Sequence, residues 1–193
     1  MDEAAIGEVI GSSSTELTAE SRQLHIAPPF GSFIKVEQRQ ETIYAVVFNA
    51  STQSLDPNRL ATAYHLPEEE LRAEHPQIFE LLKTQFEAVI IGYENAGVLR
   101  HHLPPQPPRL HSFVYACHLT EIRRLTAYMG FLRALMRVDR VPRDELIAAT
   151  LRNAATVYGE DERRFLVQAG KELVKLVGDD YEMLTSILQR VQS

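Results

Sequence analysis

The sequence predicts an α+β protein, with a small N-terminal β-barrel carrying a helical insert and a C-terminal bundle of about four helices. Two observations predict this fold class. Short segments rich in β-branched and aromatic residues, separated by Gly, Pro and Ser, occupy most of residues 1–119, and apolar residues recur at helical spacing from residue 120 onward. We therefore expect a barrel domain over residues 1–119, with its insert at about residues 67–85, and a helical domain over residues 120–193.

The barrel strands are predicted from alternation and composition. Leu17 and Ala19 fall on one face of an alternating segment, which is typical of a strand with one buried side. The other segments are β-branched and aromatic, as strands usually are. The predicted strands are residues 15–20, 33–36, 42–48, 86–93 and 111–119.

Prolines and glycines delimit the predicted helices. Pro67 and the three glutamates after it predict the start of the insert, because acidic side chains complement the N-terminal end of a helix dipole. Pro76 breaks the insert into two short pieces. The bundle helices follow from their caps: residues 120–138 beginning at Thr120, residues 142–158 beginning at Pro142 and followed by Gly159, residues 160–177 followed by Gly178, and a last helix that Asp179 and Glu182 begin.

The glycine-rich segment near the N-terminus does not predict a phosphate loop. Gly7 and Gly11 have neither of the two usual spacings, and no Lys follows them. The Gly170-Lys171 pair lies inside a predicted helix and is followed by Glu, not by Ser or Thr. We therefore expect a strand connection at the serines after Gly11, and no cofactor.

Three segments of the first half together resemble the HAS-barrel, the small barrel named for HerA-type ATPases and the ATP synthases. They are IGEVIGSSSTELTAES, which contains a Gly-x-Val-x-Gly strand and turn, then PPFGSFIKVE, and then TIYAVVFNAS. FEAVIIGY and PPRLHSFVYAC are similar to the returning strands that close such barrels, so the resemblance covers about residues 4–119.

The resemblance implies a role in assembly without a motor. In HerA-type proteins the barrel precedes a RecA-like ATPase domain, and in ATP synthases it forms a crown that ties subunits into a ring. Here no Walker A lysine and no βα repeat follow, and residues 120–193 are too few for a RecA-like fold. The resemblance thus implies the barrel's assembly function without the motor, next to a different neighbouring domain.

Charge is unevenly distributed along the chain. The formal net charge is −6, and residues 1–100 hold 15 acidic against 7 basic side chains. Between Glu121 and Arg143, six arginines accompany two acids. An acidic chain is a poor general binder of nucleic acid, and the arginine cluster keeps that function open as an alternative.

No catalytic or metal-binding group is evident in the sequence. His101, His102, His111, Cys117 and His118 are the candidates, but their spacing matches no usual zinc pattern. Cys117 and His118 are neighbours on a predicted strand, so their side chains point to opposite faces and cannot form a nucleophile–base pair. We expect no enzyme and no metal site.

The helix predicted after Thr120 supplies the candidate binding residues. It is apolar around most of its circumference, so it must be buried on two sides or bind a partner. The predicted partner-binding residues are Tyr128, Met129, Phe131, Leu132, Leu135 and Met136. An arginine stripe on the same helix either pairs with acids of the barrel or a partner, which we favour, or contacts phosphates; it comprises Arg123, Arg133, Arg137 and Arg140.

These residues predict a non-enzymatic assembly or adaptor module that binds a protein partner or a second copy of itself. An accessory factor in DNA or RNA processing, with phosphates on the arginine stripe, is the alternative. No apolar run is long enough to span a bilayer, the acidic N-terminus does not resemble a signal peptide, and Cys117 has no second cysteine to pair with. We therefore expect a cytoplasmic protein without a membrane partner.

Overall fold

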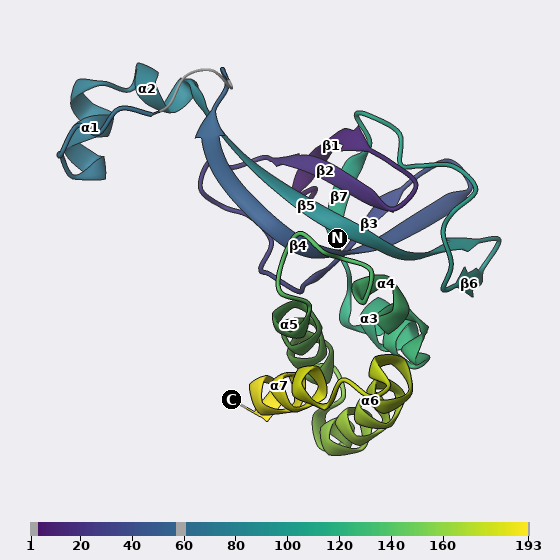
Figure 1. The fold of residues 1–193 in the computed structure, drawn as a ribbon. Coiled ribbons are helices and arrows are strands. Elements are labelled where there is room, and N and C mark those ends of the chain that lie inside the picture. Colours follow the sequence, from purple (N-terminus) through teal and green to yellow (C-terminus); the bar gives the residue numbers. More distant parts are fainter. Residues whose placement is uncertain (1–3, 57–60, 193) are drawn as a thin grey trace.

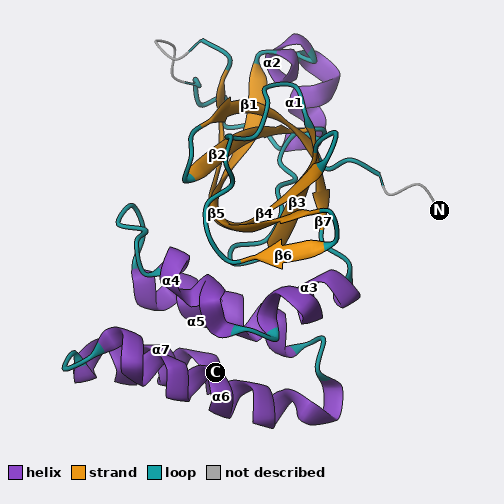
Figure 2. Cartoon of the chain, turned by 90° about the vertical axis from the view of Figure 1, so that its right-hand side faces the viewer, coloured by secondary structure: helices purple, strands orange, loops and turns teal. Residues whose placement is uncertain are grey.

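The computed structural model describes residues 4–56 and 61–192 of the 193-residue chain. A β-barrel lies on top of a stack of helices, and a long arm extends from the barrel to one side (Figure 1). In the side view the helices form two layers, with those of residues 119–155 next to the barrel and those of residues 162–192 beyond them (Figure 2). The predicted architecture, a barrel with a helical insert followed by helices, is confirmed.

Six antiparallel strands close the barrel. Their order around it is β1, β2, β5, β4, β3 and β7, and β7 pairs again with β1. A short strand, β6, adds to β5 outside the barrel. The strands are β1 (Gly7–Ser12), β2 (Glu16–Ser21), β3 (Phe33–Glu37), β4 (Glu41–Ser54), β5 (Leu82–Asn95), β6 (Val98–Arg100) and β7 (Phe113–Ala116).

The barrel interior is filled by alternate residues of every strand. Leu17 and Ala19 both point inward and are fully buried, as their alternation predicted. The turn between β1 and β2 contains Ser13, whose hydroxyl accepts the backbone N–H of Thr15 and Glu16, so this segment is a strand connection as expected. The interior cluster consists of Val9, Leu17, Ala19, Ile34, Val36, Ala45, Val47, Phe86, Ala88 and Val114.

Strands β4 and β5 are longer than predicted and leave the barrel as a two-stranded ribbon. Their pairing continues to Ser54 opposite Leu82, and two short helices, α1 (Glu68–Glu74) and α2 (Gln77–Glu80), lie at the far end. We call the described residues 51–56 and 61–85 the arm. In both views its helices lie far from the helical layers (Figures 1 and 2).

The helical region has slightly more than the four expected helices. Besides two 3₁₀ turns, η1 (Met129–Phe131) and η2 (Gly159–Asp161), it contains α3 (Leu119–Thr126), α4 (Leu132–Leu135), α5 (Arg143–Ala155), α6 (Glu162–Val177) and α7 (Tyr181–Gln192). Gly178 follows α6 with φ 64°, as predicted from the left-handed conformation that glycine adopts readily. Asp180, one residue after the predicted cap, accepts the N–H of Met183 at the start of α7.

The single helix predicted over residues 120–138 is interrupted. After Thr126 the chain passes through Tyr128 in an extended conformation and then through η1 before α4 begins. One straight helix would point its apolar residues in nearly all directions. The break turns Met129, Phe131 and Leu132 toward the same core, which explains why the long apolar helix does not form.

The outer face of β3, β4 and β5 shares one core with the helices. Phe33, Val46 and Phe48 point away from the barrel interior and are almost completely buried among residues of α3 to α7. The helical region therefore covers this side of the barrel, and residues of both predicted domains contribute to this one apolar cluster. Within the described part of the chain, no helix is long and apolar enough to cross a membrane.

Candidate functional site

Most of the predicted partner-binding residues lie inside the chain's own core. Met129, Phe131, Leu132 and Leu135 are buried, and the ring of Phe131 meets Phe33 of the barrel edge to face, with 6.1 Å between centroids. Met136 packs at the edge of the same cluster. Tyr128 alone of the six is open to solvent, with 76% of its surface exposed. A partner can therefore reach Tyr128 directly, whereas Phe131, Leu132 and Leu135 already pack against the barrel.

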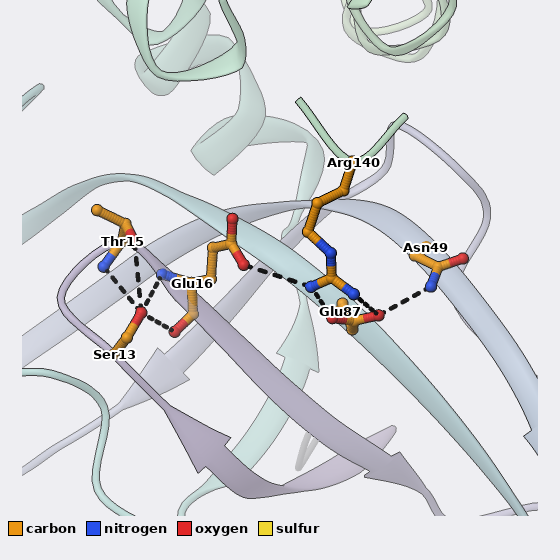
Figure 3. A network of polar contacts seen from close by, with 6 residues as sticks. All are labelled: Ser13, Thr15, Glu16, Asn49, Glu87 and Arg140. Atoms are coloured by element: carbon orange, nitrogen blue, oxygen red, sulfur yellow. Dashed lines mark hydrogen bonds and ion pairs between the residues drawn. The ribbon is translucent and has the colours of Figure 1, made fainter. Parts of the chain in front are cut away.

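Arg140 joins the loop after α4 to the barrel (Figure 3). Its guanidinium donates to both carboxylate oxygens of Glu87 on β5, with a distance of 3.0 Å from Nη2 to Oε1, and lies 3.6 Å from Glu16 on β2. Asn49 of β4 donates to the same Glu87 carboxylate at 2.8 Å. Hydrogen bonding to Glu87 raises the pKa of Arg140 above its usual value. This arginine pairs with barrel acids, as we favoured for the stripe.

The other three stripe arginines have different surroundings. Arg123 lies over the ring of Tyr158, 5.4 Å from its centroid, and 3.9 Å from Asp161. Arg133 and Arg137 are exposed on the surface of the α4 region. The break after Thr126 separates Arg123 from these two, so the four arginines do not form one continuous stripe.

Two adjoining clefts lie where the segment around Tyr128 faces α6. The smaller has a volume of about 260 Å³ and the larger about 540 Å³, and both are lined by Ala127 and Gln168. We call them together the basic groove. Their charged lining consists of five basic residues and two acids: Arg123, Arg133, Arg164, Lys171, Lys175, Asp161 and Glu172. The sequence pattern does not predict this site, because three of its cations lie on a helix that begins some forty residues after Arg123.

The arm has the opposite charge. Helix α1 carries Glu68, Glu69, Glu70 and Glu74 against the single cation Arg72, and all five side chains are exposed. Arg72 pairs with Glu68 at 2.8 Å and lies over the ring of Phe79. The remaining three glutamates have no ion pair with any residue of the described chain, so α1 presents a net negative surface to solvent.

A second polar cluster joins the barrel to α3. Lys35 of β3 is 5% exposed, and its ammonium donates to Glu121 at 3.0 Å and lies 3.2 Å from Glu37. Glu94 of β5 accepts from Tyr44 at 3.2 Å and from Arg124 at 3.0 Å. Burial, and after it the charge of Glu94, raises the pKa of Tyr44 far above its usual value. These groups satisfy one another, so they attach α3 to the barrel.

The histidines that were considered as metal ligands are dispersed. His111 contacts Glu8 at 2.6 Å, His118 is the N-cap of α3, and Cys117 is buried. His101 packs against Gly130. A β-carbon added at Gly130 would lie only 2.9 Å from the β-carbon of His101. Among residues 4–56 and 61–192, no three His, Cys, Asp or Glu side chains are grouped as a metal site.

His101 is expected to make the stability of the protein depend on pH. Its Nδ1 is buried without a hydrogen-bond partner in the described structure, and burial lowers the pKa of the ring below 6.5. As the pH falls below about 6.5, the unfolded chain takes up a proton that the folded chain resists, so the free energy of unfolding decreases. Urea unfolding at pH 7.5 and 5.5 should show a smaller decrease for His101→Gln than for the native chain. His102→Gln, at the exposed neighbouring position, should behave like the native chain.

The barrel defines the class of protein, a closed six-stranded antiparallel β-barrel with one side covered by helices. Residues 6–96 match the family model described as the HAS barrel domain, so this part of the chain is a HAS barrel domain. The matched residues include β1 to β5, and β7, which closes the barrel between β1 and β3, lies after them. No curated protein matches the chain.

Proposed function

We propose that this chain is a non-enzymatic protein-assembly module, in which the HAS barrel is the scaffold and the arm is the contact element. The observation that carries the proposal is that no side chain of residues 61–81 is buried, although these residues include two helices. Tyr64, Leu66 and Leu81 are each at least 40% exposed. The HAS barrel match supports a module for assembly or interaction.

The energetics of the arm support a partner that covers it. Ordering one residue costs about 1–2 kcal/mol of backbone entropy, which burial of apolar surface normally offsets. Isolated helices of fewer than about 12 residues are marginal in water, and α1 has seven residues and α2 has four. An element of this kind acquires compensating contacts when it docks on another molecule. The single cysteine of the sequence, Cys117, is in keeping with the reducing cytoplasm as the site of that assembly.

Removing the end of the arm tests the proposal. Residues 55–81 are replaced by Asn-Gly, which favours the tight turn of a hairpin, so that Ser54 and Leu82 remain paired. Because none of the described residues removed is buried, we expect the shortened chain to keep its circular dichroism spectrum and its thermal unfolding midpoint within a few degrees. Tagged full-length and shortened chains are then recovered from native extract, and their masses are measured by light scattering.

The full-length chain should be recovered in a species heavier than its own 21.9 kDa, and the shortened chain as a monomer. If both are monomeric, the assembly function is wrong. If both are recovered in the same larger species, another surface makes the contact and the arm is not the contact element.

A further inference from the structure

We infer that the arm of one copy of this chain docks in the basic groove of a second copy. The inference rests on the proposed assembly function and names its partner and the receiving site. It is carried by the presence, in one chain, of an exposed acidic helix in the arm and of a groove lined mainly by basic residues.

The groove has the charge and spacing to receive an acidic helix. Lys171 and Lys175 are four residues apart on α6, so both point from the same helix face into the larger cleft. Arg133, which belongs to α4, lines the same cleft. Lys175 is 2.9 Å from Glu172, and the five cations of the two clefts still exceed their two acids by three charges.

The arm offers the complementary pattern. Glu70 and Glu74 are also four residues apart and thus share one face of α1, with Glu69 beside them. Because Arg72 forms its ion pair with Glu68, it does not neutralise these three carboxylates. Three uncompensated negative charges on α1 therefore match the three excess positive charges of the groove.

Both surfaces also carry exposed apolar side chains. Tyr128 lines the larger cleft with 76% of its surface exposed. Leu66 and Tyr64 immediately precede α1 and are 40% and 44% exposed. Aromatic residues contribute strongly to protein interfaces, so the contact would bury apolar surface at its centre as well as pairing charges.

The two surfaces cannot meet within one chain. The arm leaves one end of the barrel, and α6 lies in the outer helical layer on the far side of the barrel (Figures 1 and 2). Contact between them must therefore join two copies. Because the arm and the groove are different surfaces, two copies that exchange arms form a symmetric pair, and a head-to-tail contact forms rings or open chains.

A second copy fits the charge distribution better than nucleic acid does. The net charge of −6 repels a polyanion as a whole, and the acidic arm adds to this repulsion. A second copy instead satisfies both charged surfaces in the same contact. Nucleic acid in the groove is therefore the competing outcome of the experiment.

Charge reversal with mixing tests the inference. The arm variant carries Glu69→Lys, Glu70→Lys and Glu74→Lys, and the groove variant carries Arg133→Glu, Lys171→Glu and Lys175→Glu. A control variant reverses three exposed acids elsewhere, Glu160→Lys, Glu162→Lys and Glu182→Lys. Solution mass is measured by light scattering over a range of concentrations, at low and high salt, for each full-length chain and for an equimolar mixture of the first two variants.

The native and control chains should associate, with a dissociation constant that rises at least about tenfold at high salt. The arm and groove variants should each be monomeric, since each repels its own copies. Their mixture should associate again, because the basic arm of one variant now faces the acidic groove of the other.

Three outcomes would overturn the inference, and they affect the proposed function differently. If the arm and groove variants keep the native mass, copies associate through another surface and the assembly function stands. If the native chain is monomeric at every concentration, the second copy is not the partner, and the arm-deletion experiment alone decides the function. If the native mass rises only with an added single-stranded oligonucleotide and the groove variant abolishes that rise, the groove binds phosphates and both proposals are wrong.

Discussion

Phe131→Ala is expected to lower the free energy of unfolding by about 3–5 kcal/mol, the range for large aromatic residues truncated in a core. Phe131 is completely buried between the barrel and the helices and contacts Phe33 edge to face. The truncation removes this ring and leaves a cavity at the junction, which neighbouring backbone can fill only in part. Denaturant unfolding, followed by circular dichroism and by tyrosine fluorescence, measures the loss.

The same experiment tests whether barrel and helices unfold together. Because Phe131 belongs to the cluster that contains Val46 of the barrel and Leu173 of α6, both probes should shift by the same amount in a single transition. Tyr128→Ala is the control, since that ring is exposed and its removal should change stability by less than about 1 kcal/mol. Two separate transitions, with only one moved by Phe131→Ala, would show that the barrel folds independently of the helices.

The barrel was predictable because its signal is local. Leu17 and Ala19 alternate with polar residues. A strand that turns one face toward a barrel interior shows this alternation, because successive side chains point to opposite faces. The glycines and prolines between strands restrict where turns can form. The ribbon beyond the barrel gives no such signal. From Ala50 to Gln53 the side chains are small or polar and exposed on both faces, so neither alternation nor hydrophobicity marks this segment as a strand.

The candidate sites were less predictable, because they depend on distant parts of the chain. The apolar segment from Met129 to Leu135 was identified correctly as one that must be covered, but only the fold shows that the barrel covers it. The basic groove combines Arg133 with Lys171, and their proximity follows from how α6 packs. Lys35 appears in the sequence as the polar member of a strand, and its burial depends on Glu121, which is 86 residues away.

Gly31→Ala is expected to destabilise the protein by more than about 3 kcal/mol, through backbone strain and steric overlap together. Gly31 has φ 78°, a conformation that costs a residue with a β-carbon about 1–2 kcal/mol. It also lies where the loop before β3 touches α5. A β-carbon there would lie 2.7 Å from the backbone nitrogen of Thr150 and 2.8 Å from the carbonyl carbon of Ala149. Neither backbone can move away without displacing α5 from the barrel.

Gly97→Ala separates the two contributions. Gly97 has the same φ of 78°, but a β-carbon there meets no other atom within 4 Å in the described structure, so the substitution adds strain without overlap. We expect Gly97→Ala to cost about 1–2 kcal/mol and Gly31→Ala to exceed it by at least about 1 kcal/mol. The denaturant midpoints of the two variants give the difference in their free energies of unfolding, provided that this free energy falls with denaturant concentration at the same slope in both. Equal losses would mean that the loop moves away from α5 at little cost, and that the close contact between barrel and helices at Gly31 does not contribute to stability.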